Sequence, residues 1–215
     1  MMNNLSHSTV VPGGITYNGL VLTSIDVKPS PNKEGYVMFS GGKKGRADDD
    51  TATFLTDVKE IDEKDEAGER MFEAKKLTVK EAKAIINETS GEDGKCKPLF
   101  CVHGYNTSPR DHLKTFNDSV NGKFKKDKKF KPVPVIWPTQ ETLDDYKGDR
   151  DHSATGAGRA FKTLKRGVDS FPSKSLLCHS MGNYVLRHAA DAKFRFDNIF
   201  MVAAVSSNVC RTGTK

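Results

Sequence analysis

The chain has 215 residues, enough for one domain with a sizeable core, and carries a formal net charge of +6 at pH 7. No apolar run approaches the roughly 18 to 20 residues of a membrane-spanning helix, and the polar residues 1–8 lack the apolar centre of a secretion signal. We therefore expect a cytoplasmic protein without a membrane span.

The positive charge is concentrated in one short segment. Between residues 123 and 131, six lysines and one aspartate carry five of the six net charges, so the rest of the chain is nearly neutral. Proteins that bind nucleic acids usually have a broad basic face, and we therefore expect no nucleic-acid partner. Phe124 and Phe130 lie among these lysines, where they could stack on bases, which keeps nucleic-acid binding open as an alternative.

The cysteines show no spacing typical of a metal site. They are Cys96, Cys101, Cys178 and Cys210. Two of them lie inside apolar runs, where a thiol packs as a small hydrophobic side chain. We expect buried free thiols, no bound metal and no cofactor, with disulfides as the alternative.

Residues 1–95 are predicted to form an N-terminal extension with edge strands and one helix. The alternating stretch 15–27 and the short apolar run 36–39 are typical of a hairpin or of edge strands. The glycine-rich residues 41–45 lack the pattern of a phosphate-binding loop. We interpret the acidic residues 57–69 as a solvated connection.

The helix of this extension has a recognisable start. Thr78 and Glu81 have the spacing of a capping box, in which each side chain bonds the backbone N–H of the other residue. The pattern predicts a helix that continues through Ile85 and Ile86 and ends near the polar residues 90–95.

From residue 98 onward, short apolar runs alternate with amphipathic segments. The predicted strands are 99–102, 133–137, 176–178 and 199–205. The predicted helices are 109–120, 157–168 and 182–193. Continuous apolar strands separated by helices indicate a parallel sheet that is covered on both faces. We expect an α/β core over residues 96–215, with a mostly parallel, doubly wound sheet, that forms one structural domain together with residues 1–95.

Residues 178–182, Cys-His-Ser-Met-Gly, connect the third of these strands to the third helix. A nucleophile elbow needs small residues around its serine because the backbone is strained there. Gly182 satisfies this requirement, while Cys178 stands where the G-x-S-x-G pattern has its first glycine. The following helix start offers backbone N–H groups, notably that of Met181, to a developing oxyanion. The pattern predicts that Ser180 is a nucleophile.

Two further motifs lie at the carboxyl ends of the preceding strands. Residues 103–106 are His-Gly-Tyr-Asn, and Trp137 is followed by proline. With the elbow residues 179–183, this order resembles the DUF900-like branch of the α/β-hydrolase superfamily. That branch has H-G-Y-N after one strand, W-P after the next and H-S-M-G-N at the elbow. The resemblance covers roughly residues 98–205.

The resemblance implies a serine hydrolase, an esterase or lipase, that acts on a small-molecule acyl ester. Ser180 would attack the acyl carbon, and the backbone N–H groups of Tyr105 and Met181 would form the oxyanion hole. The residues implied in substrate binding are His103, Gly104, Asn106 and Trp137. As alternatives, His103 forms hydrogen bonds within its own loop and Trp137 is a core aromatic residue.

The chain departs from the family pattern after Ser180. The superfamily places its acid after a later strand, where this branch has Ala-Ala-Pro-Asp and residues 203–206 are Ala-Ala-Val-Ser. Asp191 and Asp197 precede that strand and should lie at the opposite end of the sheet, and His188 lies in the helix that leads away. We therefore expect a fold that is incomplete at its C-terminus, with the base and acid beyond this sequence.

Three alternatives remain open. The loop 139–153 contains His152, which with Asp149 or Asp151 could form a nonstandard Ser-His-Asp arrangement with Ser180. The chain could also be a noncatalytic α/β-hydrolase-like binding protein, or a truncated fragment that lacks the acid and histidine. The sequence predicts no oligomeric state.

Overall fold

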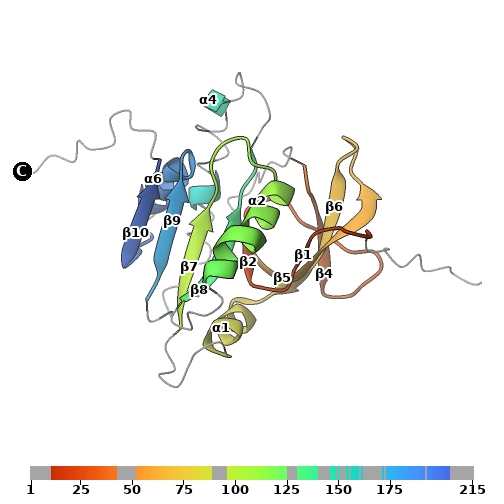
Figure 1. Ribbon diagram of the computed structural model, residues 1–215, viewed down its shortest axis with the longest axis horizontal. Helices are drawn as coiled ribbons and strands as arrows, with labels where there is room; N and C mark the ends of the chain where they lie inside the picture. Colours follow the sequence, from red (N-terminus) through yellow and green to blue (C-terminus); the bar gives the residue numbers. More distant parts are fainter. Residues whose placement is uncertain are drawn as a thin grey trace, which may run out of the picture.

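In a computed structural model, the described residues form a mixed ten-stranded sheet with helices packed against it (Figure 1). The structure describes residues 11–42, 52–88, 96–124, 130–139, 146–148, 150, 154, 156–159, 161, 171, 173–191 and 193–203. The strands are β1 (Thr16–Tyr17), β2 (Val21–Thr23), β3 (Lys28–Pro29), β4 (Tyr36–Ser40), β5 (Thr53–Lys64), β6 (Arg70–Leu77), β7 (Lys97–Val102), β8 (Phe130–Ile136), β9 (Ser175–His179) and β10 (Asn198–Val202). The helices are α1 (Val79–Glu88), α2 (Pro109–Thr115), α3 (Gly122–Phe124), α4 (Tyr146–Gly148) and α6 (Gly182–Asp191), with the π-helix η1 (Phe116–Asn121) after α2.

The sheet consists of a parallel part and an antiparallel part joined at β2. The strand order is β10-β9-β7-β8-β2-β5-β6-β4-β3, and β1 pairs with β5. Strands β10, β9, β7, β8 and β2 are parallel to their neighbours in this order. From β2 through β5, β6 and β4 to β3, each pair is antiparallel. The expected parallel arrangement is therefore found in one part of a mixed sheet.

The interpretation of residues 57–69 as a solvated connection is wrong. Residues 57–64 belong to β5, and residues 65–69 form the turn that leads to β6. Strand β5 has a mixed pattern in which Phe54, Val58 and Ile61 are buried, while Asp62 is exposed. A strand with one buried face needs only part of its residues to be apolar.

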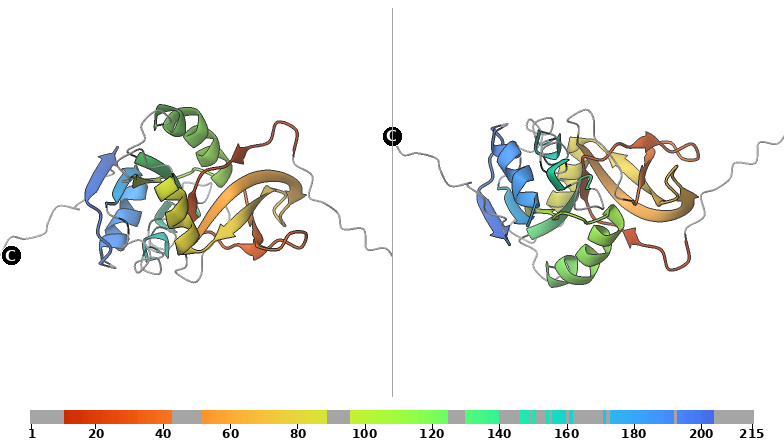
Figure 2. Two further views of the ribbon diagram at one scale, coloured as in Figure 1. Left: turned by 90° about the horizontal axis from the view of Figure 1, so that it is seen from below. Right: turned by 90° about the horizontal axis from the view of Figure 1, so that it is seen from above.

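Helices cover both faces of the sheet, as the two views of Figure 2 show. On β7, Phe100 and Val102 point to the face covered by α1 and α6, while Leu99 and Cys101 point to the face covered by α2. This alternation follows from the two-residue period of a strand. No helix in the described residues is long and apolar enough to span a bilayer.

The predicted helix starts of α1 and α2 are confirmed. Glu81 accepts a hydrogen bond from the Thr78 N–H at 2.7 Å, and Thr78 Oγ1 accepts one from the Glu81 N–H at 3.2 Å. Ser108 caps α2 by accepting from the Asp111 N–H at 3.0 Å. Such caps satisfy N–H groups that the first helical turn leaves without partners. The start of α2 is thereby defined directly after the loop 103–108.

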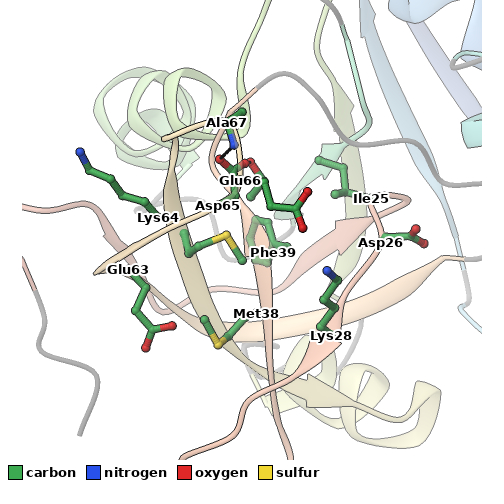
Figure 3. A pocket seen from close by; sticks show the side chains of 12 residues that line it. Ile25, Asp26, Lys28, Met38, Phe39, Glu63, Lys64, Asp65, Glu66 and Ala67 are labelled. Atoms are coloured by element: carbon green, nitrogen blue, oxygen red, sulfur yellow. Dashed lines mark hydrogen bonds between the residues drawn. The ribbon is translucent and has the colours of Figure 1, made fainter. Parts of the chain in front are cut away.

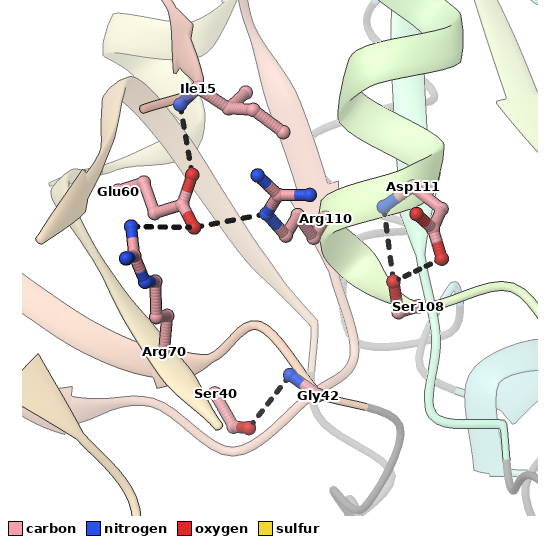
Figure 4. A network of polar contacts seen from close by, with 8 residues as sticks. All are labelled: Ile15, Ser40, Gly42, Glu60, Arg70, Ser108, Arg110 and Asp111. Carbon is pink, nitrogen blue, oxygen red and sulfur yellow. Dashed lines mark hydrogen bonds and ion pairs between the residues drawn. The ribbon is translucent and has the colours of Figure 1, made fainter. Parts of the chain in front are cut away.

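A buried carboxylate joins the antiparallel strands to α2 (Figure 4). The side chain of Glu60 on β5 is fully buried and accepts hydrogen bonds from the Ile15 N–H and from Arg110 Nε, each at 3.0 Å. Arg70 Nη1 lies 3.9 Å away. Burial would raise the pKa of Glu60, but these hydrogen bonds and charges outweigh it and lower the pKa below its usual value.

The thiols of Cys96, Cys101 and Cys178 are buried and free, as expected. Burial raises the pKa of Cys101 and of Cys178 to about 12, which keeps both protonated. Cys210 and the central lysines of the basic segment, residues 125–129, lie outside the described residues.

Candidate functional site

Three loops meet at the carboxyl ends of β7, β8 and β9. These strands are parallel neighbours, so the residues that follow them lie at the same edge of the sheet. The loop after β7 begins with His103, Trp137 follows β8, and Ser180 follows β9. The structure therefore brings the three sequence motifs together.

Ser180 lies on a tight turn between β9 and α6. Its φ angle is +49°, in the left-handed region that non-glycine residues rarely adopt. The Ser180 N–H donates to Val202 O of β10 at 2.9 Å. Ser180 O accepts from the Asn183 N–H at 3.1 Å and from Asn183 Nδ2 at 2.7 Å. Hydrogen bonds to β10 and to α6 therefore hold Ser180 in this strained backbone conformation.

Two glycines allow the loop 103–106 to contact this turn. A Cβ at Gly104 would lie 3.0 Å from Ser180 Cβ and 3.0 Å from His179 Nδ1. A Cβ at Gly182 would lie 2.7 Å from His103 O, a backbone atom that cannot rotate away. Gly182 therefore requires glycine, whereas a Cβ at Gly104 would displace its neighbours by a few tenths of an ångström; the loop lies directly against Ser180.

His103 holds the loop to the end of β8. Its Nε2 accepts from the Trp137 N–H at 3.2 Å, and its Nδ1 is 2.9 Å from Gly104 O. Since a carbonyl oxygen only accepts, these partners assign the proton to Nδ1. The Trp137 indole Nε1 donates back to His103 O at 3.0 Å. The prediction that His103 forms hydrogen bonds within its own loop is confirmed, and both of its ring nitrogens are occupied.

A stack of rings lies beneath the same loop. The His103 ring stacks on Trp137 at a centroid distance of 5.3 Å and lies 4.7 Å from the His112 ring of α2. Trp137 is fully buried, which agrees with the alternative of a core aromatic residue. His112 Nε2 is buried without a hydrogen-bond partner in the described part of the chain. Burial, and then the neighbouring His103, lower the pKa of His112 well below its usual value.

Stability should fall in acid because of His103. Burial lowers its pKa to about 4 from a usual value of 6.5, so the unfolded chain binds the proton more tightly. The contribution of the neutral His103 ring to the free energy of unfolding is complete above pH 6.5 and is lost as the pH falls toward 4. We expect the free energy of unfolding to decrease by ~3 kcal/mol over this range through His103 alone.

Urea unfolding between pH 4 and pH 7 measures this loss. The control is His103→Asn, which keeps a side-chain donor near Gly104 O but does not titrate in this range. The variant should lose less stability on acidification than the natural chain does. Equal pH slopes in both proteins would contradict the assignment of His103 as a buried neutral ring.

The predicted oxyanion donors flank this contact. Met181 is buried directly after Ser180, and its N–H makes no hydrogen bond within the part of the chain that the structure describes. Tyr105 is half-buried and packs against the core, and Asn106 has a φ angle of +57°. The first turn of α6 begins here, because the Tyr184 N–H donates to Met181 O at 2.9 Å. The positive end of the helix dipole is therefore close to Ser180.

The described acids and histidines after Ser180 lie away from it. Asp197 Oδ2 accepts from the Lys174 N–H at 2.6 Å, just before β9 begins, which confirms that Asp197 lies at the opposite end of that strand. Asp191 ends α6, and its Oδ2 is 3.9 Å from His188 Nδ1. The ten residues of α6 extend about 15 Å from the elbow.

His152 and Asp149, the candidates for an internal base and acid, lie outside the described residues. Their assignment stays a prediction, as do the substrate-binding roles of His103, Gly104, Asn106 and Trp137. For His103 and Trp137, the observed hydrogen bonds favour a role in holding the loop.

The sequence reasoning missed three residues that support the site. Asn183 bonds Ser180 O, His112 packs on His103, and Thr139 Oγ1 donates to Thr107 O at 3.0 Å. Asn183 was visible as the last residue of the elbow motif. His112 lies four residues after the helix cap Ser108, but nothing in the local sequence indicates which ring it contacts.

A family model matches residues 78–205 of the chain, which is more than half of its length. The model is DUF900, described as an alpha/beta hydrolase of unknown function. The matched range begins at the α1 capping box and includes the loop 103–106 and the elbow. Comparisons with curated proteins and with solved structures found no match.

Proposed function

Because the chain belongs to the DUF900 family of alpha/beta hydrolases, we propose that it is a serine hydrolase that cleaves carboxylic esters of small molecules. Ser180 is the nucleophile of this reaction, and the backbone N–H groups of Tyr105 and Met181 are the oxyanion donors. The observation that supports the proposal best is the strained φ angle of +49° at Ser180, on a strand-to-helix turn against Gly104.

The proposed reaction has two stages. A base takes the hydroxyl proton of Ser180, whose oxygen bonds to the acyl carbon, and the carbonyl oxygen becomes an oxyanion bound by the two N–H groups. The ester C–O bond then breaks, and the alcohol leaves with the proton from the base. Water attacks the acyl-serine in the same way, which releases the carboxylic acid and restores Ser180.

We propose that the catalytic base and acid are not among the described residues. His103 cannot take the proton from Ser180 without breaking its bonds to Trp137 and Gly104, and burial keeps its pKa at about 4. A base works best with a pKa near the working pH. His152 with Asp149 is therefore the arrangement within this chain that merits testing.

We also propose the type of core and the number of domains that carry the site. Parallel strands with helices on both faces support a doubly wound core of the α/β-hydrolase type. Strand β2 pairs with both β8 and β5, which supports one structural domain over residues 1–95 and 96–215. The substrate contacts the site at Gly104 and Asn106, next to the oxyanion donors.

A fluorophosphonate probe tests the proposed function, because it reacts with activated serines. We expect covalent labelling of the natural chain at Ser180 and no labelling of Ser180→Ala. The variant Ser108→Ala, which alters only a helix cap, should label normally. Absence of labelling at Ser180 in the folded natural chain would contradict the proposal and favour a noncatalytic binding protein.

A further inference from the structure

The antiparallel part of the sheet contains a cavity of about 570 Å³, within the size range typical of ligand pockets. Figure 3 shows the side chains that line it. All of them precede residue 78, where the family match begins. The cavity therefore belongs to the N-terminal part of the chain and shares no residue with the elbow.

The floor of the cavity is apolar. Ile25 follows β2, Met38 and Phe39 come from β4, and Met71 comes from β6. The Phe39 ring stacks on Phe72 in the core with a centroid distance of 5.4 Å, which fixes the position of β4 against β6. The two thioethers are flexible and polarizable, so they adapt to the shape of a bound group. This floor suits an apolar side chain.

One wall is the turn between β5 and β6, which Asp65 holds in place. Its carboxylate accepts hydrogen bonds from the N–H groups of Ala67 at 2.9 Å and Glu69 at 2.8 Å. It also accepts one from the Ser40 hydroxyl of β4 at 2.6 Å. The Gly68 N–H donates to Asp65 O at 2.9 Å. The wall is thus preorganised, and Asp65 is engaged by its own surroundings.

Four exposed charged side chains of the lining remain without such engagement. Within the described residues, no hydrogen bond or ion pair is made by Asp26, Lys28, Lys64 or Glu66. In Figure 3 the Glu66 carboxylate and the Lys28 ammonium group point toward the same space beside Phe39, while Lys64 points away from it. A positive and a negative group therefore face an apolar floor without satisfying each other.

We propose that this cavity binds a zwitterion with an apolar side chain, such as an apolar α-amino acid. The ligand's ammonium group binds the Glu66 carboxylate, and its carboxylate binds the Lys28 ammonium group. Such charge-assisted hydrogen bonds are stronger than neutral ones. The apolar side chain of the ligand lies on Met38 and Met71. This site does not depend on the proposed esterase activity.

Three small probes test the inference by NMR titration of the full chain. L-phenylalanine should shift the backbone amide signals of Ala67 and Gly68 and reach saturation. Phenethylamine lacks the carboxylate and 3-phenylpropionate lacks the ammonium group. Each should bind at least about tenfold more weakly, because one charged contact is lost.

Single substitutions at exposed positions assign each contact. Glu66→Gln should weaken the binding of L-phenylalanine and of phenethylamine but leave the binding of 3-phenylpropionate unchanged. Lys28→Met should weaken the binding of L-phenylalanine and of 3-phenylpropionate but leave the binding of phenethylamine unchanged. Lys64→Met is the matched control and should bind L-phenylalanine as the natural chain does. Failure of L-phenylalanine to shift the signals, or equal binding of phenethylamine, would overturn the inference. Neither result bears on Ser180 labelling.

Discussion

Ser180→Ala is expected to lower kcat/KM for p-nitrophenyl butyrate by at least about 10³-fold. The substitution removes the attacking oxygen, so only binding and the oxyanion donors remain to accelerate hydrolysis. Initial rates of p-nitrophenol release measure the effect. Thermal unfolding provides the control, because alanine keeps the backbone strain and leaves the hydrogen bonds to Ser180 O intact. A variant with unchanged kcat/KM would exclude Ser180 as the nucleophile.

The variant Ser180→Gly separates the chemistry from the backbone strain. It should be as inactive as Ser180→Ala. Glycine adopts a φ angle of +49° without the steric cost that a Cβ brings. We therefore expect it to be about 1 kcal/mol more stable than the alanine variant, measured by urea unfolding. A less stable glycine variant would contradict the strained turn.

Gly104→Ala should lower kcat by about 10²-fold with little change in KM. The new Cβ would lie 3.0 Å from Ser180 Cβ, so the loop that carries the Tyr105 N–H is expected to shift away from Ser180, the proposed nucleophile. Oxyanion donors act mainly in the transition state, and their displacement therefore affects kcat more than binding. Steady-state kinetics with the same ester measure both constants.

Gly122→Ala is the matched control for this substitution. Among the described residues, a Cβ at Gly122 would meet only Asn117 O at 3.9 Å, an ordinary contact distance. This variant should keep the kinetics of the natural chain. If Gly104→Ala also kept them, the loop 103–106 would not supply an oxyanion donor.

The parallel strands could be predicted from the sequence because their signals are local. Each of β7, β8, β9 and β10 overlaps a predicted apolar run. Strands β7 and β8, which are buried on both faces, need continuous apolar residues, and β10 has such a run although its side chains are exposed. The helix caps of α1 and α2 could be predicted for the same reason, because each cap joins residues that are three positions apart in the sequence.

The antiparallel part could not be predicted in this way. Strand β5 contains the buried Glu60, whose charge is compensated by Arg110, fifty residues later in the chain. A carboxylate at such a position indicates a solvated segment until its distant partner is known. The cavity near Phe39 likewise depends on pairing between β4 and β6, which local patterns do not report.

The candidate site was only partly accessible to sequence reasoning. The elbow motif and Gly182 identify a tight turn, because few residue types tolerate it. The position of Gly104 against Ser180 arises from the neighbouring arrangement of β7 and β9. The fixed neutral state of His103 depends on Trp137, a residue of a different loop. These contacts follow from the sheet order rather than from any single motif.

The most direct test of the nucleophile is to isolate the acyl-enzyme. The natural chain is mixed with p-nitrophenyl butyrate, quenched in acid within the first turnover and digested for mass spectrometry. We expect a butyryl group on the peptide that contains Ser180, formed together with an initial burst of p-nitrophenol. Rapid hydrolysis with the butyryl group on another residue, or with no acylated peptide, would contradict the central claim that Ser180 is the nucleophile.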